Sequence, residues 1–472
     1  MHKAGFSDNL LRGGVPRMAL TGLLAAIAAV ALGDLLEVVA RLRTGLDASV
    51  EGGGLALVLV AAAMTSLVLA WLVRGPVGDR IDPAALLVGL GLLIGLRIAA
   101  VILVDAPLIV DWLRYHELAA SISQGGDWFA NRPSGYSMLL SVGYRIFGPN
   151  PVVGEWLNVG LGLASGLLVY ALALRAAGSR AAGVALVLYA VAPAEILMTP
   201  VLGTEIAYGA LLVGVAWVLL AAPPTVVRAA IAGAVLGASQ YVRATSQVMA
   251  PFLAIAAARL ATAGRRWLIG LVFAASFVGV LAPVIVANID RGGGPSISTS
   301  SFSAWQLLIG SNQEHDGRFN ADDVALVGGE AAAGTVEAER IAMRVALERI
   351  GEDPIGTLGL VARKFPVVWG DAHYGARWAL HEDPAQDPRV TQTFVLLSQL
   401  AWVLVAALAA VGAWRKRAGS GRTVALLGMV LVVFVLIHAL GEANPRYHAP
   451  LVPIFSVLAG IGAAGLLAKR ET

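Results

Sequence analysis

The residues of this chain best suited to chemistry lie in one polar stretch, 108–136, between apolar segments. The helical repeat puts Asp111, Arg114, Tyr115 and Leu118 on one face of a helix. A carboxylate that could serve as a general base would then stand beside a cation. An ordinary surface ion pair between Asp111 and Arg114 has the same spacing, so this stretch alone does not decide between a site and a surface pair.

More charged groups interrupt apolar sequence further along the chain. A Gly125-Gly126 break leads to Arg132 in an Asn-Arg-Pro corner, where proline stiffens the backbone. Three later polar places are Thr204-Glu205, Arg243 and the run from Glu442 to His448, which contains Arg446 and Tyr447. Because charge is costly in lipid, such groups should face a cavity or one another.

These residue types match a transfer reaction on a lipid phosphate. A carboxylate can deprotonate an acceptor hydroxyl, and arginines can hold the phosphate that leaves. Asp111 with Arg114, Arg132, Arg243 and Arg446 meets both demands. The alternative is a set of interhelical ion pairs with a purely structural role.

Composition indicates the elements that must position these groups. Of 472 residues, 58% are hydrophobic and only 14% are charged, which excludes an ordinary soluble enzyme and indicates membrane-spanning helices. The net charge of +3 is too small and dispersed to suggest a nucleic-acid partner. The chain has no cysteine, which excludes disulfides and thiolate chemistry. The apolar stretch from Met18 past Leu36 is too long for a cleaved signal and is expected to be retained as the first span.

Apolar segments predict an all-α polytopic membrane protein with about twelve transmembrane helices. The predicted spans are 17–40, 53–73, 83–104, 152–174, 182–199, 205–222, 228–240, 246–261, 267–288, 392–412, 423–440 and 449–468. Basic residues gather in alternate loops, so the positive-inside rule places both termini in the cytoplasm and 105–151, 289–391 and 441–448 outside. Residues 228–261 are interpreted as a hairpin with Arg243 at its external tip, since a single helix would reverse all later loops.

The predicted organisation has four parts. They are a hairpin at 1–82, a core at 83–288 that includes the external loop 105–151, an external domain at 289–391, and a last set of spans at 392–472. The external block is too long to be unstructured. Thr335 should cap a helix over 336–350 with Ile341, Met343, Val345 and Leu347 on its apolar side, and Pro354 should start another that runs to about Trp369. The second helix suits a membrane interface, with a plain packed lid as the alternative.

At these residues the chain resembles the membrane glycosyltransferases of the C-type fold (GT-C), particularly bacterial relatives of protein O-mannosyltransferases and aminoarabinose transferases. The family pattern D-E-x-R-Y-x-E, then G-D-W and a proline-rich corner, is matched by Asp111 to Glu117, Gly126-Asp127-Trp128 and Asn131 to Tyr136. Tyr241 to Thr245 looks like the family's T-R-P hairpin, and Asn444 to Pro450 looks like its R-Y-x-x-P segment. Each motif is short, so order and spacing over about 83–468 carry the resemblance.

The resemblance implies a role for each motif. Asp111 would be the catalytic base, Arg114 and Arg132 would bind a polyprenyl phosphate, and Arg243 and Arg446 would line the donor pocket. The supporting residues would be Tyr115, Glu117, Tyr136, Glu205 and Tyr447, with Glu205 either structural or in support of the site. Trp112 stands where the family has a second acidic residue, and Ala244 replaces the hairpin proline. No cofactor is indicated, because the histidines form no compact metal signature and a divalent ion stays open without support.

The resulting hypothesis is an inverting glycosyltransferase of a bacterial inner membrane. It would move one sugar from a polyprenyl-phosphate donor to an acceptor hydroxyl of a glycan, lipid or protein on the external face, with membrane lipid as its surroundings. Two alternatives stay open: a multi-span transporter or flippase, and a polysaccharide polymerase or ligase. The charges at one face and the absence of a convincing repeat favour the transferase. Sugar, acceptor, prenyl length and oligomeric state are not readable from the sequence.

Overall fold

The structure is a computed structural model that describes residues 14–45, 80–129, 133–290, 294–299, 303–329, 335–381, 387–415 and 420–467. Over these ranges the chain forms helices joined by turns and bends, without a strand. The prediction of an all-α polytopic membrane protein is confirmed.

Seven helical segments are long and apolar enough to cross a bilayer. They comprise α2 (Gly14–Gly45), α4 (Pro83–Leu103), α7 (Pro151–Ala177), η1 (Ala263–Arg265) continued by α13 (Arg266–Val280), α20 (Pro388–Trp414), α21 (Gly421–Leu440), and η3 (Pro445–Leu451) continued by α22 (Val452–Leu467). Four shorter apolar helices accompany them: α8 (Ser179–Ala190), α10 (Glu205–Leu220), α11 (Val226–Val242) and α12 (Ser246–Leu260). Every predicted span except 53–73 coincides with these helices; that segment lies outside the described residues, so the count of twelve stays a prediction.

Two predicted spans are broken. Segment 182–199 divides into α8, which ends at Ala190, and the short α9 (Pro193–Leu197). Proline disfavours helical backbone at the residue before it, which explains an end ahead of Pro193. Segment 267–288 divides at Leu281 into α13 and α14 (Ala282–Asp290), next to Pro283. The hairpin reading of 228–261 matches α11 and α12, which are joined at Arg243 to Thr245.

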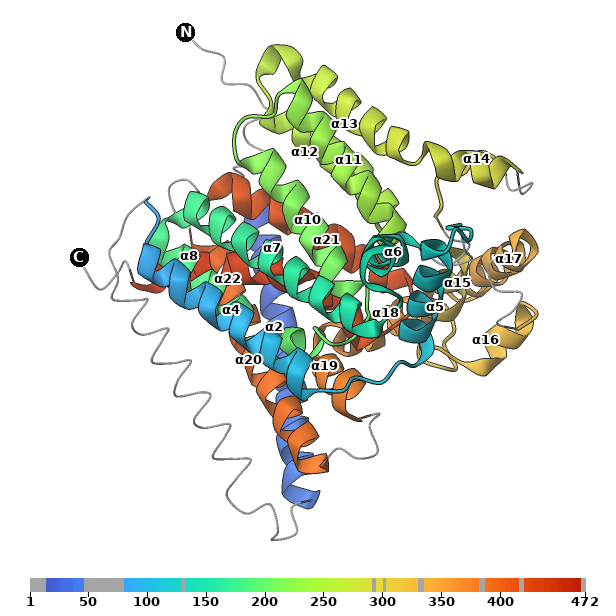
Figure 1. Ribbon diagram of the computed structural model, residues 1–472, viewed down its shortest axis with the longest axis horizontal. Coiled ribbons are helices and arrows are strands. Elements are labelled where there is room, and N and C mark those ends of the chain that lie inside the picture. The colour runs from blue at the N-terminus through green and yellow to red at the C-terminus, as the bar shows by residue number, and fades with distance from the viewer. Residues whose placement is uncertain are drawn as a thin grey trace.

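The centre of the bundle is formed by α8 and α22, whose residues are nearly all buried. Helices from opposite ends of the chain meet here: α2 lies along α20, and α20 packs on α22 (Figure 1). The backbones approach closely, since a Cβ atom on Gly462 would clash with the carbonyl oxygen of Leu408. Small residues allow such contacts between apolar helices.

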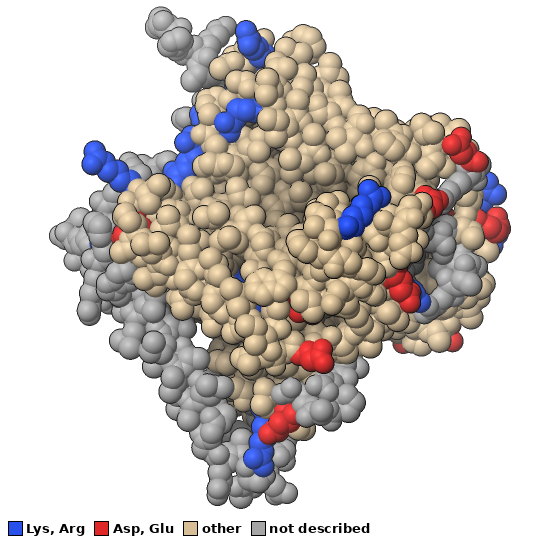
Figure 2. Space-filling model, viewed as in Figure 1, with Lys and Arg blue, Asp and Glu red and all other residues tan. Residues whose placement is uncertain are grey.

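A group of shorter helices, the outer helices, covers one end of the bundle. Most of them lie at the right of Figure 1. It comprises α5 (Val110–Ser123), α6 (Gly135–Phe147), α15 (Ser303–Gly310), α16 (Ala321–Leu326), α17 (Val336–Glu352), α18 (Pro354–Trp369), α19 (Tyr374–Ala376) and η2 (Arg377–His381). Around Trp305 and Leu308, α15 and α17 build a small core separate from that of the bundle. In the face shown in Figure 2, most visible lysines and arginines lie to the left and top and the acidic residues to the right and below.

The helix capped by Thr335 forms as predicted, since the Thr335 hydroxyl accepts from Ala338 N at 3.2 Å. Its buried side agrees with the prediction in part, because Ile341 and Val345 pack against the small core. Ala338, Ala342 and Ala346 are buried, whereas Met343 and Leu347 are 40% and 56% exposed. The small residues face α15 because they let the two helices approach closely, which the apolar periodicity did not reveal. The helix starting at Pro354 ends at Trp369, as predicted.

Candidate active site

A cavity of about 1670 Å³ opens where the bundle meets the outer helices. Segments far apart in sequence line it: the outer end of α2, α5, the α11–α12 tip, α15, residues 371–378, and 441–447. Asp111, Arg114, Tyr115 and Leu118, predicted to share a face of α5, all line it. The backbone turns sharply just before them, because Val110 has a φ of 45°, a left-handed conformation that β-branched residues rarely adopt.

The central contact joins the first polar stretch to the end of the chain. The Nη2 atom of Arg446 lies 2.6 Å from Oδ2 of Asp111, and both side chains are largely buried. The Arg446 guanidinium also lies 4.9 Å from the Trp112 ring centroid and 5.8 Å from that of Trp378. Trp112, which replaces an acidic residue of the resembled family, is therefore an aromatic partner of Arg446. Aromatic faces attract guanidinium groups and fix their plane.

A second ion pair lies beside the first. Arg243 donates through Nε to the Thr204 hydroxyl at 3.0 Å and through Nη2 to Oε1 of Glu205. Glu205 begins α10 and is almost fully buried, and its Oε1 is 3.9 Å from Nε of Arg446. Thr204 lines the cavity, whereas Glu205 lies behind the two arginines. Glu205 is thus placed to orient both guanidinium groups from the protein side.

Tyr447 lies beneath both arginines. Its ring centroid is 5.5 Å from the Arg243 guanidinium, and its hydroxyl donates to Oε2 of Glu442 at 2.8 Å. The amide of Gln306 donates to the same oxygen at 3.1 Å. Gln306 belongs to α15, so an outer helix helps to fix the segment that carries Arg446. Sequence reasoning did not find Gln306, because an isolated glutamine carries no motif.

Of the other predicted site residues, some line the cavity and some do not. Tyr115 and Glu117 line the cavity, and burial together with nearby Asp111 raises the pKa of Tyr115 to about 12, so its phenol stays protonated. Tyr136 is fully buried away from the cavity, where its hydroxyl donates to Oδ1 of Asn158 at 3.1 Å. Arg132 lies outside the described residues.

Several cavity residues had no signal in the sequence. His373 and Asp371 approach within 2.8 Å, and although burial alone would lower the pKa of His373, its contact with Asp371 raises it above its ordinary value. Arg318, Phe319 and Trp378 line the cavity too. None of these residues belongs to a recognisable sequence motif. They come from two separate segments, 318–319 and 371–378, which only the folded chain brings to the same cavity. In the described part of the chain, no group of three or more acidic or histidine side chains is placed to hold a metal ion.

The fold and the cavity define the class of protein: an all-helical, multi-pass membrane protein with a charged cavity where outer helices cover its bundle. No family model matches the chain, and no curated protein matches it.

Three solved structures, all of GT-C glycosyltransferases, are similar to the chain. ArnT from Cupriavidus metallidurans, an aminoarabinose transferase, bound to undecaprenyl phosphate, is 14% identical with a TM-score of 0.38, over 81% of this chain and 78% of that one. Its apo form is 15% identical with a TM-score of 0.37, over 81% and 77%. An Archaeoglobus fulgidus oligosaccharyltransferase tethered with an acceptor peptide is 16% identical with a TM-score of 0.34, over 80% and 55%. At these values the likeness assigns neither substrate nor reaction to this chain.

Proposed function

We propose that this protein is a glycosyltransferase that moves a single sugar from a polyprenyl-phosphate donor to an acceptor hydroxyl on the external face of a bacterial inner membrane. The observation that carries the proposal is the pairing of Asp111 with Arg446 beside Arg243 and Glu205, in a large cavity at the outer helices. A buried carboxylate adjacent to two oriented guanidinium groups suits a reaction that removes a proton and releases an anion.

The proposed reaction is a direct displacement. One Asp111 carboxylate oxygen takes the proton of the acceptor hydroxyl as the hydroxyl oxygen bonds to the anomeric carbon. The bond from that carbon to the phosphate oxygen breaks, its electron pair leaves with the polyprenyl phosphate, and the configuration inverts. Arg446 and Arg243 stabilise the phosphate charge as it develops, and fixed donors in a buried site do so more effectively than water.

The side chains that hold the two arginines in place would lower the activation free energy of the displacement. Trp112 and Trp378 hold the plane of Arg446, while Glu205 and Thr204 hold Arg243 from behind. A guanidinium held in place before the substrate arrives loses little freedom when the phosphate binds. The proposed orientation, with cytoplasmic termini and an external site, rests on the distribution of basic loops and not on the chemistry of the site.

The test is turnover of purified protein with radiolabelled polyprenyl-phosphate sugars, with Asp111→Asn beside it. We expect Asp111→Asn to bind the donor and to lose transfer by at least about a hundredfold, the usual size of a general-base contribution. Glu348→Gln is the matched control, since Glu348 is an exposed carboxylate of α17 that does not line the cavity. Near-normal turnover of Asp111→Asn would reject the mechanism. Energy-dependent uptake into proteoliposomes without transfer would favour a carrier, and use of a diphosphate-linked oligosaccharide would favour a polymerase.

A further inference from the structure

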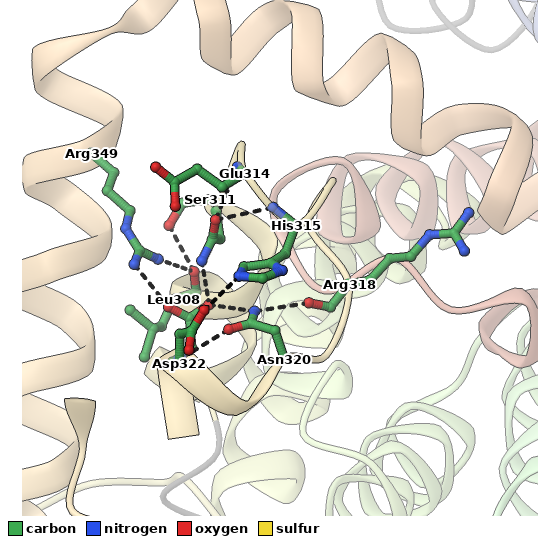
Figure 3. A network of polar contacts seen from close by, with 10 residues as sticks. Leu308, Ser311, Glu314, His315, Arg318, Asn320, Asp322 and Arg349 are labelled. Atoms are coloured by element: carbon green, nitrogen blue, oxygen red, sulfur yellow. Dashed lines mark hydrogen bonds and ion pairs between the residues drawn. The ribbon is translucent and has the colours of Figure 1, made fainter. Parts of the chain in front are cut away.

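The loop that joins α15 to α16, residues 311–320, is held by hydrogen bonds along much of its length. Oδ1 of Asn312 accepts from the backbone N–H groups of Glu314 and His315 at 3.0 and 3.3 Å. The Asn312 carbonyl accepts from Gly317 N at 2.8 Å, and the Arg318 carbonyl accepts from Nδ2 of Asn320 at 3.0 Å. Figure 3 shows His315, Asn320 and Asp322 close together in this network.

A buried carboxylate anchors this network. Asp323 is fully buried and accepts from Nδ2 of Asn312 at 3.0 Å, from Nδ2 of Asn320 at 2.8 Å and from Nη2 of Arg349 at 2.8 Å. Burying a charge is costly unless it is paired and hydrogen-bonded, and a fully satisfied network of this kind makes its surroundings rigid. The loop is therefore a preformed element of the structure.

The loop is also tied to the segment that carries Arg446. Asp316 and Gly317 have φ values of 51° and 66°, which reverse the chain just before Arg318. The Gly317 carbonyl accepts from Ala443 N at 2.8 Å. Nζ of Lys364 donates to the carbonyls of Gly310 at 2.7 Å and Gly441 at 3.0 Å. The loop and the 441–447 segment consequently form one unit.

This rigid framework presents two exposed side chains to the cavity, Arg318 and Phe319. Phe319 is 57% exposed, so its ring is accessible to an apolar group in the cavity. Among the residues that the structure describes, Arg318 has no ion-pair partner. Figure 3 shows its side chain extended away from Asn320 and Asp322.

The charges of the central site make this cation significant. Asp111 and Glu205 pair with Arg446 and Arg243, so these two arginines add no net positive charge to the centre, while Arg114 and Arg377 also line the cavity. Arg318 adds a positive charge, without an ion-pair partner in the described chain, where the 311–320 loop lines the cavity.

We propose that Arg318 and Phe319 form the acceptor subsite and that the acceptor carries a phosphate or carboxylate beside an apolar group or sugar ring. The anion would pair with Arg318 and the apolar part would pack on Phe319. The word acceptor rests on the function proposed above; the anion subsite does not. Because the loop that carries Arg318 and Phe319 is already ordered, binding of the acceptor does not have to offset the entropy lost in ordering it.

The first experiment measures binding to the full-length purified protein by native mass spectrometry. The probes are dioctanoyl phosphatidate, neutral dioctanoylglycerol and glucose 6-phosphate. We expect Arg318→Gln to weaken phosphatidate binding about tenfold, the effect of losing one charged hydrogen bond, and to leave dioctanoylglycerol unchanged. Phe319→Ala should weaken both lipids. Arg340→Gln, an exposed arginine of α17 outside the cavity, is the control and should bind like the wild type.

The outcomes separate this inference from the proposed function. Arg318-dependent binding of phosphatidate alone supports a lipid acceptor, and the same dependence for glucose 6-phosphate supports a free or glycan-borne anion. Equal phosphatidate binding by wild type and Arg318→Gln overturns the subsite, whatever the enzyme transfers. In the transfer assay, Arg318→Gln should raise the acceptor KM about tenfold without changing donor binding. If no donor supports transfer but anion binding still requires Arg318, the proposed function fails and the anion subsite stands.

Discussion

At the scale of single residues, the site depends on which side chains surround Arg446. Two indole rings, an Asp111 oxygen at 2.6 Å and a buried glutamate leave its guanidinium one orientation. Trp112, which differs from the motif of the resembled family, is one of the two indoles that contact Arg446.

This geometry predicts that Arg446→Lys is not a conservative change. An ammonium group is a compact charge that cannot contact two indole rings and reach Asp111 and Glu205 together. We expect kcat/KM for the donor to fall at least about tenfold, from the loss of a charged hydrogen bond and of cation–π contacts. The measurement is steady-state transfer with varied donor, with Arg340→Lys as the control. Wild-type kinetics in Arg446→Lys would show that the planar contacts do not matter.

At the scale of elements, α18 is joined to its neighbours through one buried lysine. Lys364 is almost fully buried, and its amine bonds the last carbonyl of α15 and the carbonyl that follows α21. No carboxylate is among its hydrogen-bond partners in the described chain. Burial lowers the pKa of Lys364 from 10.5 to about 8.

The lowered pKa predicts how stability depends on pH. Between pH 8 and 10.5 the unfolded chain holds a proton that the folded chain has lost, so the contribution of Lys364 to the free energy of unfolding rises with pH across this window. Below pH 8 its unfavourable contribution is constant. The measurement is the Tm of wild type and of Lys364→Met at pH 7, 8, 9 and 10. We expect the Tm of the wild type to rise relative to that of the variant above pH 8. A constant difference would contradict a lowered pKa.

At the scale of the whole molecule, the arrangement across the membrane determines which solution reaches the cavity. We expect the α11–α12 hairpin to keep the basic loops on one side of the membrane and the outer helices on the other. Gly264, in the turn before α13, and Gly351, near the end of α17, should then lie on opposite sides. Both are exposed, and a side chain at either would meet open space.

The chain has no cysteine, so single cysteines report this topology directly. We expect a membrane-impermeant thiol reagent to label Gly351→Cys in intact cells and to label Gly264→Cys only after the membrane is permeabilised. The two glycines serve as each other's control, because α13 is the one predicted span between them. Labelling of both from outside would show that α13 does not cross the membrane, and labelling of Gly264→Cys alone would reject the hairpin or reverse the orientation of the whole chain.

The sequence by itself determined the helical class, the positions of most spans and the capped helices at Thr335 and Pro354. These follow from local physics: apolar runs of spanning length, proline at a first turn and a hydroxyl that accepts from a free N–H group. It also indicated the face of α5 with Asp111 and Arg114, since helical periodicity is a local property.

Only the tertiary structure decided which charges meet. Asp111 contacts Arg446 and Glu205 contacts Arg243 across large sequence separations, and spacing alone could not distinguish these pairings from others. The outward Met343 and Leu347 and the position of Tyr136 outside the cavity depend likewise on neighbouring helices. The Arg318–Phe319 loop has no sequence signal, because a rigid exposed pair is recognised only by the buried network that holds it.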